Sequence, residues 1–236
     1  MILEINDYCQ RLKEALLAGF GAKVCYIGLQ GSYLRGEATE TSDIDIMVIL
    51  DTLTTKDMNL YRNIIKKLGD FEKSCGFICS RIGMVNWNPL ESCQLKYATK
   101  DIYGKLADFL PKWSMADEVN YIKVSLNNLY HALCHSYIHS NREQLANNLL
   151  SHYKAAFFIL QNIYFWENYH SGEQESVFVL PKAELVKKLQ GEDKEVLETT
   201  LFFINGGQVD FDKHFELLLH WCQNKIARVS NEIAGI

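Results

Sequence analysis

The segment Asp43–Leu50, DIDIMVIL, constrains the fold more than any other part of the sequence. In an extended chain, Ile44 and Ile46 point to one face, while Met47 and Ile49 point to the other. A strand that is apolar on both faces has to be covered on both, which is typical of a sheet flanked by helices. The segment therefore predicts a covered strand with two carboxylates at its entrance.

Further helix and strand signals surround this strand. Residues 3–19 and 53–70 carry apolar side chains at helical spacing, and glycine stands at or next to the end of each stretch. Strands are predicted at 24–31, 76–87 and 93–101, with an Asn-Pro turn between the last two. The first half of the chain is therefore expected to be an α/β domain with a small mixed sheet.

The pattern changes after the sequence LPKW, near Pro111. From there on almost every segment has helical periodicity, and helices are predicted at 115–140, 142–169, 181–190, 192–204 and 210–233. We expect two domains, residues 1–112 and residues 113–236, the second an all-α helical bundle.

Charge and composition exclude several classes of protein. The net charge is −5. Residues 1–112 hold 14 basic and 14 acidic side chains, whereas residues 113–236 hold 10 and 15. An acidic second half argues against nucleic acid as a partner, because nucleic-acid binding depends on clustered Lys and Arg.

The apolar runs and the cysteines indicate the cellular compartment of the protein. No run approaches the roughly 20 apolar residues of a membrane span, so no membrane partner is expected. Seven scattered cysteines without an export signal indicate reduced thiols in a cytoplasmic protein.

Asp43 and Asp45 are the strongest candidates for chemistry. Two carboxylates at i and i+2 on a strand project to the same face, about 6.5–7 Å apart at their Cα atoms. Oxygen ligands so placed suit Mg²⁺ together with substrate phosphates. A two-ion site for phosphoryl transfer needs ions about 3.5–4 Å apart, which these carboxylates can reach.

A glycine-serine turn precedes the aspartates. Gly31 lets backbone amides approach a phosphate closely, and the Ser32 hydroxyl can donate to phosphate oxygens. Gly36 allows the loop to return toward the aspartate strand, and Ser42 can steady that return through a local hydrogen bond. The turn and the aspartates together predict a site for a metal-bound phosphate compound.

The stretch GSYLRGEATETSDIDIMVIL, residues 31–50, resembles the signature of the DNA polymerase β-type nucleotidyltransferase superfamily. The order of a catalytic domain followed by a helical bundle is similar to kanamycin nucleotidyltransferase and to minimal nucleotidyltransferases. This resemblance implies a two-ion Mg²⁺ site at Asp43 and Asp45, with Gly31 and Ser32 holding the triphosphate. It also implies transfer of a nucleoside monophosphate, with ATP as the expected donor, to a hydroxyl of a small molecule such as an aminoglycoside. A homodimer through the helical half is a further expectation.

One departure from the family pattern concerns a third carboxylate. The superfamily usually has an acid on a later strand, facing the first two. In the predicted strand 93–101 the expected place holds Ala98, with Glu91 before the strand and Asp101 after it. Either acid could substitute if the strand is shifted.

Lys154 is the only charged residue between Glu143 and Glu167. Burying such a lysine is costly unless an anion meets it. In kanamycin-type enzymes a lysine of the helical domain reaches the triphosphate, so Lys154 is a candidate phosphate contact. A lysine whose ammonium group reaches solvent is the alternative.

The sequence therefore favours a Mg²⁺-dependent nucleotidyltransferase. A catalytically weak nucleotide-binding protein that lacks the third carboxylate is the first alternative. A regulatory partner of a toxin-like protein is the second.

Overall fold

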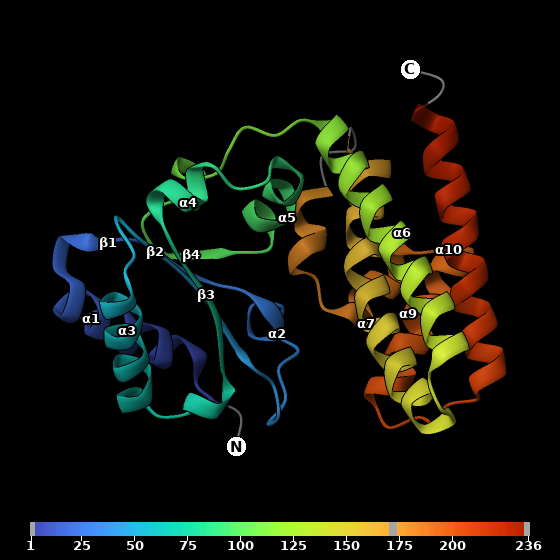
Figure 1. The fold of residues 1–236 in the computed structure, drawn as a ribbon, viewed down its shortest axis with the longest axis horizontal. Helices are drawn as coiled ribbons and strands as arrows, with labels where there is room; N and C mark the ends of the chain where they lie inside the picture. Colours follow the sequence, from blue (N-terminus) through green and yellow to red (C-terminus); the bar gives the residue numbers. More distant parts are fainter. Residues whose placement is uncertain (1–2, 170–173, 234–236) are drawn as a thin grey trace. The chain divides into compact units, whose positions relative to one another are not determined.

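The computed structural model describes residues 3–169 and 174–233, and the chain divides into two compact units, residues 1–113 and 114–236. The first unit contains a sheet with helices and the second is helical, as the sequence predicts (Figure 1). Within the described ranges, none of the helices has the length and apolar character needed to cross a bilayer.

The sheet of the first unit has four strands in the order β3-β2-β1-β4. The strands are β1 (Val24–Leu29), β2 (Ile44–Leu50), β3 (Ser74–Ser80) and β4 (Lys100–Tyr103). Strand β1 runs antiparallel to β2 and β4, and β3 runs parallel to β2. The sheet is therefore mixed, and β2 is an inner strand.

Helices cover both faces of this sheet, as the apolar character of β2 requires. One face packs on α1 (Ile5–Phe20) and α3 (Thr55–Leu68), through buried residues such as Leu12, Ile64 and Val48. The other face, which includes Met47 of β2, packs on Met84 of α4 (Arg81–Val85) and on residues near β4. Asp45 has the same parity as Met47, so it belongs to this second face.

Two predicted strands were wrong in part. The strand expected at 76–87 ends at Ser80, whose hydroxyl accepts a hydrogen bond from the Gly83 backbone N–H and caps α4. Most of the strand expected at 93–101 is the helix α5 (Ser92–Tyr97), followed by the short strand β4. Helix-forming Gln, Leu and Lys outweigh the weak alternation there, and the Thr99 hydroxyl donates back to the Leu95 carbonyl at 2.7 Å.

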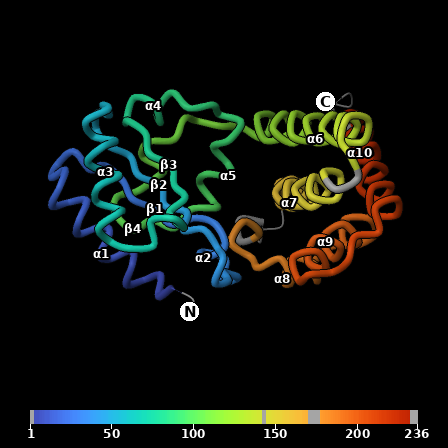
Figure 2. Tube along the Cα trace, turned by 60° about the horizontal axis from the view of Figure 1, so that its bottom comes forward, coloured from blue at the N-terminus to red at the C-terminus, as the bar shows by residue number. Residues whose placement is uncertain are grey.

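The second unit is a helical bundle. Helix α6 packs on α7 and α10, and α9 packs on α7, α8 and α10 (Figures 1 and 2). The helices are α6 (Met115–His139), α7 (Arg142–Glu167), α8 (Lys182–Lys188), α9 (Gly191–Ile204) and α10 (Phe211–Ile233). Helix α7 supplies much of the core, because Tyr153, Phe157 and Leu160 are all buried.

A buried ion pair joins α9 to α10. The Asp193 carboxylate accepts a hydrogen bond from the Lys225 ammonium group at 2.6 Å and another from the Trp221 indole N–H at 2.6 Å. The side chains of Lys225 and Asp193 are only 9% and 13% exposed. Removal of one partner would therefore leave the other charge in a poorly hydrated place.

We expect Asp193→Asn to lower the free energy of unfolding by about 3 kcal/mol, because it leaves the Lys225 ammonium group without its counter-charge. The control is Lys187→Met, which removes a solvent-exposed pair with Glu184 and should cost less than about 1 kcal/mol. Urea denaturation followed by circular dichroism measures both values. Equal effects of the two substitutions would contradict this account of the pair.

Candidate nucleotide-binding site

Asp43 and Asp45 stand at the entrance of β2. Asp43 is exposed and lies just before the strand, and Asp45 is half-buried within it. Burial raises the pKa of the Asp45 carboxyl above its usual range, and the negative charge of Asp43 raises it further. Two carboxylates that repel each other in a partly dehydrated place form a site that a cation would stabilise.

The backbone of Gly31 lies directly against the Asp45 carboxylate. Strand β1 leads into this turn, and the Gln30 N–H donates to the Asp45 carbonyl at 2.9 Å. Gly31 has a φ of 72°, and a Cβ atom added there would lie 1.9 Å from Asp45 Oδ2. Only glycine fits this position, both because of its φ and because of the contact.

The loop after the turn returns the chain to β2. Gly31 begins the single helical turn α2 (Gly31–Leu34), and Gly36 has a φ of 68° where the loop bends back. The Ser42 hydroxyl accepts a hydrogen bond from the Thr39 N–H at 2.8 Å, which holds the bend closed. Ser42 thus has a local structural contact, and its predicted contact with nucleotide stays a prediction.

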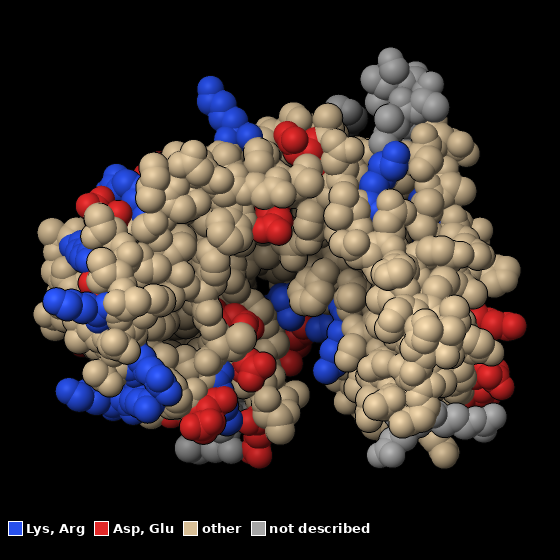
Figure 3. Space-filling model, viewed as in Figure 1, with Lys and Arg blue, Asp and Glu red and all other residues tan. Residues whose placement is uncertain are grey.

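Acidic side chains gather over α2 and the loop that follows it (Figure 3). Arg35 forms an ion pair with Glu37 at 2.7 Å, and its positive charge acts against the rise in the pKa of Asp45. The local charge is therefore negative, which favours an anionic substrate only when a cation accompanies it.

Cys75 is a member of this site that the sequence analysis missed. Strand β3 runs parallel to β2, and its register pairs Cys75 with Asp45. Paired residues on neighbouring strands point to the same face, and the exposed Cys75 thiol acts to lower the pKa of the Asp45 carboxyl. A neutral thiol thus occupies the nearest position from which a neighbouring strand could present a third acid to this pair.

Neither acid proposed as the third carboxylate fits the site. Ala98 follows α5 and is not on a strand, so the expected place was wrong. Glu91 accepts a hydrogen bond from the Trp87 indole N–H at 2.5 Å. Asp101 lies on β4, two strands away from β2, and its carboxylate accepts from the Tyr26 hydroxyl at 2.7 Å.

The remaining candidates are more loosely defined. Ser32 is half-buried in α2, next to Gly31. Lys154 is exposed on α7, so the argument that burial requires an anionic partner does not apply to it. Over residues 3–169 and 174–233, no three His, Cys, Asp or Glu side chains are arranged as a complete metal site.

The comparison with protein families bears on the domain that carries these residues. The model of the nucleotidyltransferase domain matches residues 9–116, a stretch that contains all four strands, the Gly31 turn and both aspartates. Residues 9–116 are a nucleotidyltransferase domain. The domain belongs to a family of transferases, as the signature at residues 31–50 predicted.

Two similar proteins extend this assignment. A candidate protein adenylyltransferase of Methanocaldococcus jannaschii is 42% identical over 65 residues, which is 28% of this chain and 63% of that protein. The spectinomycin adenyltransferase AAD(9) from Enterococcus faecialis, solved with ATP and spectinomycin, matches 94% of this chain and 99% of its own. Its TM-score is 0.55 at 15% identity, so this likeness shows a shared fold.

We expect Gly31→Ala to abolish metal-dependent nucleotide binding, because the new methyl group would displace the Asp45 carboxylate. Gly36→Ala is the matched control: its φ is also positive, but a Cβ atom there meets nothing within 4 Å. Both should lose about 1–2 kcal/mol of stability from backbone strain. Calorimetric titration with MgATP, alongside urea denaturation, would contradict the contact if the two variants bind equally well.

Proposed function

We propose that this protein transfers a nucleoside monophosphate from a Mg²⁺-bound nucleoside triphosphate to a hydroxyl group of a small molecule. The observation that carries the proposal is the Asp43–Asp45 pair packed against the Gly31 turn within a nucleotidyltransferase domain. The acceptor oxygen attacks the α-phosphorus, the bond to the leaving pyrophosphate breaks, and the hydroxyl proton passes to a base or to water. The protein's part is positioning and electrostatic stabilisation.

The two aspartates fit Mg²⁺ by their chemistry. They offer only oxygen donors, and burial together with their mutual repulsion raises the pKa of Asp45. Mg²⁺ commonly binds through one or two carboxylates, with substrate phosphates and water completing its six ligands. When bound, the ion would neutralise phosphate charge. Asp43 and Asp45 would hold it, and the Gly31–Ser32 turn would hold the phosphate oxygens.

ATP is the donor best supported by the similar proteins, because AAD(9) was solved with ATP and the archaeal relative is named as an adenylyltransferase. For the acceptor, a small molecule is favoured over a protein. The likeness to the spectinomycin enzyme covers the helical unit as well, whereas the likeness to the protein-modifying relative covers 28% of the chain. The helical unit would supply the acceptor pocket, and its negative charge would suit a cationic acceptor such as an aminoglycoside.

Cys75 favours a second candidate function. With a thiol beside Asp45 and no third carboxylate at that position, the site has one fewer hard ligand and one fewer group that could accept the proton of the attacking hydroxyl. Such a site would bind a metal nucleotide but turn it over slowly. The chain would then act as a nucleotide-binding regulator in the cytoplasm, where its seven free thiols would remain reduced.

Asp43→Asn should abolish Mg²⁺-dependent binding of nucleoside triphosphate without loss of stability. Ionised Asp45 costs stability at pH values above its raised pKa, and removing the Asp43 charge reduces that cost. The variant should therefore melt at or above the wild-type temperature at neutral pH. Calorimetric titration with ATP, GTP, CTP and UTP, with and without Mg²⁺, tests the binding.

The control is Asp51→Asn, which removes an exposed carboxylate paired with Arg81 beyond the far end of β2. It should bind nucleotide as the wild type does. Unchanged MgATP affinity in Asp43→Asn would overturn the proposed site.

Cys75→Asp should separate the two candidate functions. The added carboxylate would stand beside Asp45, and we expect pyrophosphate release to rise at least about 100-fold, the lower end of the range for a positioned acid or base. Cys75→Ser is the control, because it keeps a neutral hydrogen-bonding group. If wild type and Cys75→Asp turn over equally fast, the thiol does not limit the reaction.

A further inference from the structure

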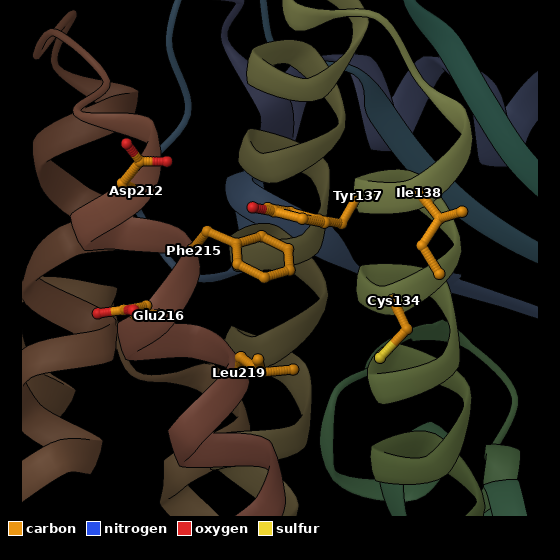
Figure 4. A pocket seen from close by; sticks show the side chains of 7 residues that line it. All are labelled: Cys134, Tyr137, Ile138, Asp212, Phe215, Glu216 and Leu219. Atoms are coloured by element: carbon orange, nitrogen blue, oxygen red, sulfur yellow. The ribbon is translucent and has the colours of Figure 1, made fainter.

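The helical unit carries a groove between α6 and α10, away from the Asp43–Asp45 pair in the chain. It encloses about 410 Å³, within the range of small-molecule sites. Its lining includes Cys134, Tyr137 and Ile138 of α6, and Asp212, Phe215 and Glu216 of α10. Figure 4 shows the Phe215 ring reaching from α10 toward Tyr137, with the two carboxylates on the α10 side.

Aromatic rings form one wall of this groove. The rings of Tyr137 and Phe215 lie 4.7 Å apart between centroids, and Phe211 stacks on Phe215 at 5.4 Å. Phe215 is buried, but Tyr137 is 53% exposed and Ile138 is 71% exposed. The groove therefore presents an apolar surface and the exposed part of the Tyr137 side chain to solvent, while the ring also stacks on Phe211 at 6.0 Å.

The only charged side chains in the lining are Asp212 and Glu216. They are four residues apart on one face of α10, so their like charges lie close together. Among residues 3–169 and 174–233, neither carboxylate has an ion pair or a side-chain hydrogen bond, and both are exposed. Two carboxylates without an ion-pair partner, next to aromatic side chains, are groups that attract a cation.

We propose that this groove binds an organic cation with an apolar body, of the arylalkyl-ammonium class. The ammonium group would lie between the Tyr137 ring and the two carboxylates, and the apolar body would cover Ile138 and Phe215. The net negative charge of residues 113–236 would further concentrate such cations at the surface. This inference is independent of the proposed nucleotidyl transfer.

A second copy of the chain suits this groove less well. A symmetric dimer brings the same patch of both subunits together, so the Asp212 and Glu216 carboxylates of both copies would gather in one interface. Like charges placed together at an interface are unfavourable. A cation, in contrast, neutralises the pair.

The first test is titration of the wild-type protein with benzyltrimethylammonium and with benzyl alcohol, which keeps the ring but lacks the charge. We expect saturable binding of the ammonium compound, at least about tenfold tighter than that of the alcohol, as carboxylates and a ring face together allow. Added salt should weaken it. Equal binding of the two compounds, or no saturable binding of either, would overturn the proposal.

The location of the ammonium site is tested with variants of the groove and by protection of Cys134 from alkylation. Asp212→Asn combined with Glu216→Gln, and separately Tyr137→Ala, should each weaken ammonium binding by about tenfold or more. The matched control Glu198→Gln removes an exposed carboxylate of α9 outside this groove and should leave binding unchanged. In a Cys75→Ser background, bound ammonium should slow alkylation of Cys134 by N-ethylmaleimide, read by mass spectrometry.

Two results would contradict the location. One is ammonium binding that neither protects Cys134 nor responds to the groove variants. The other is a wild-type dimer, measured by sedimentation, that Tyr137→Ala dissociates while ammonium binding is absent; the occupant would then be a second copy.

Discussion

The buried strand β2, with Asp43 and Asp45 at its entrance, is the constraint on which the first unit depends. Two carboxylates one residue apart, one of them half-buried, would weaken any strand that held them loosely. Strand β2 tolerates them because the rest of it, from Ile46 to Leu50, is buried on both faces between helices. Burial of the apolar residues fixes the position of the strand. The strand in turn holds the two carboxylates close together where they can reach solvent.

The Gly31 turn completes this arrangement through its backbone. The Gln30 N–H bonds to the carbonyl of Asp45, and Gly31 packs against the carboxylate of the same residue. The turn proposed to hold phosphate and the strand proposed to hold the metal ion thus share one residue, Asp45, as their point of contact. A change in either moves the other, which explains why a glycine and an aspartate 14 positions apart have to be considered together.

The sequence was sufficient for the parts of the fold that depend on local signals. The capping box of Thr54 and Asp57 begins α3, and the apolar alternation of β2 marks the inner strand. It was insufficient for the third strand of the site. Strand β3 begins at Ser74, two residues before the predicted start at Gly76, because Ser-Cys-Gly carries little strand preference and is ordered by pairing with β2. The strand–helix–strand order of β2, α3 and β3 is the signal that could have placed them side by side and parallel.

The error in the start of this strand matters because it left Cys75 outside the predicted strand. A carboxylate at this position would add a third negative charge beside Asp45. It would strengthen the attraction for a cation, and it would also strengthen the repulsion among the carboxylates while no cation is bound. The thiol instead acts to lower the pKa of the Asp45 carboxyl, which burial and the charge of Asp43 raise. The Cys75 thiol therefore favours the ionised form of Asp45. It does not, however, provide the oxygen ligand that a third carboxylate would offer to a hard cation. In the proposed function the two aspartates would hold the metal nucleotide, and the substrate's own phosphates would complete the coordination.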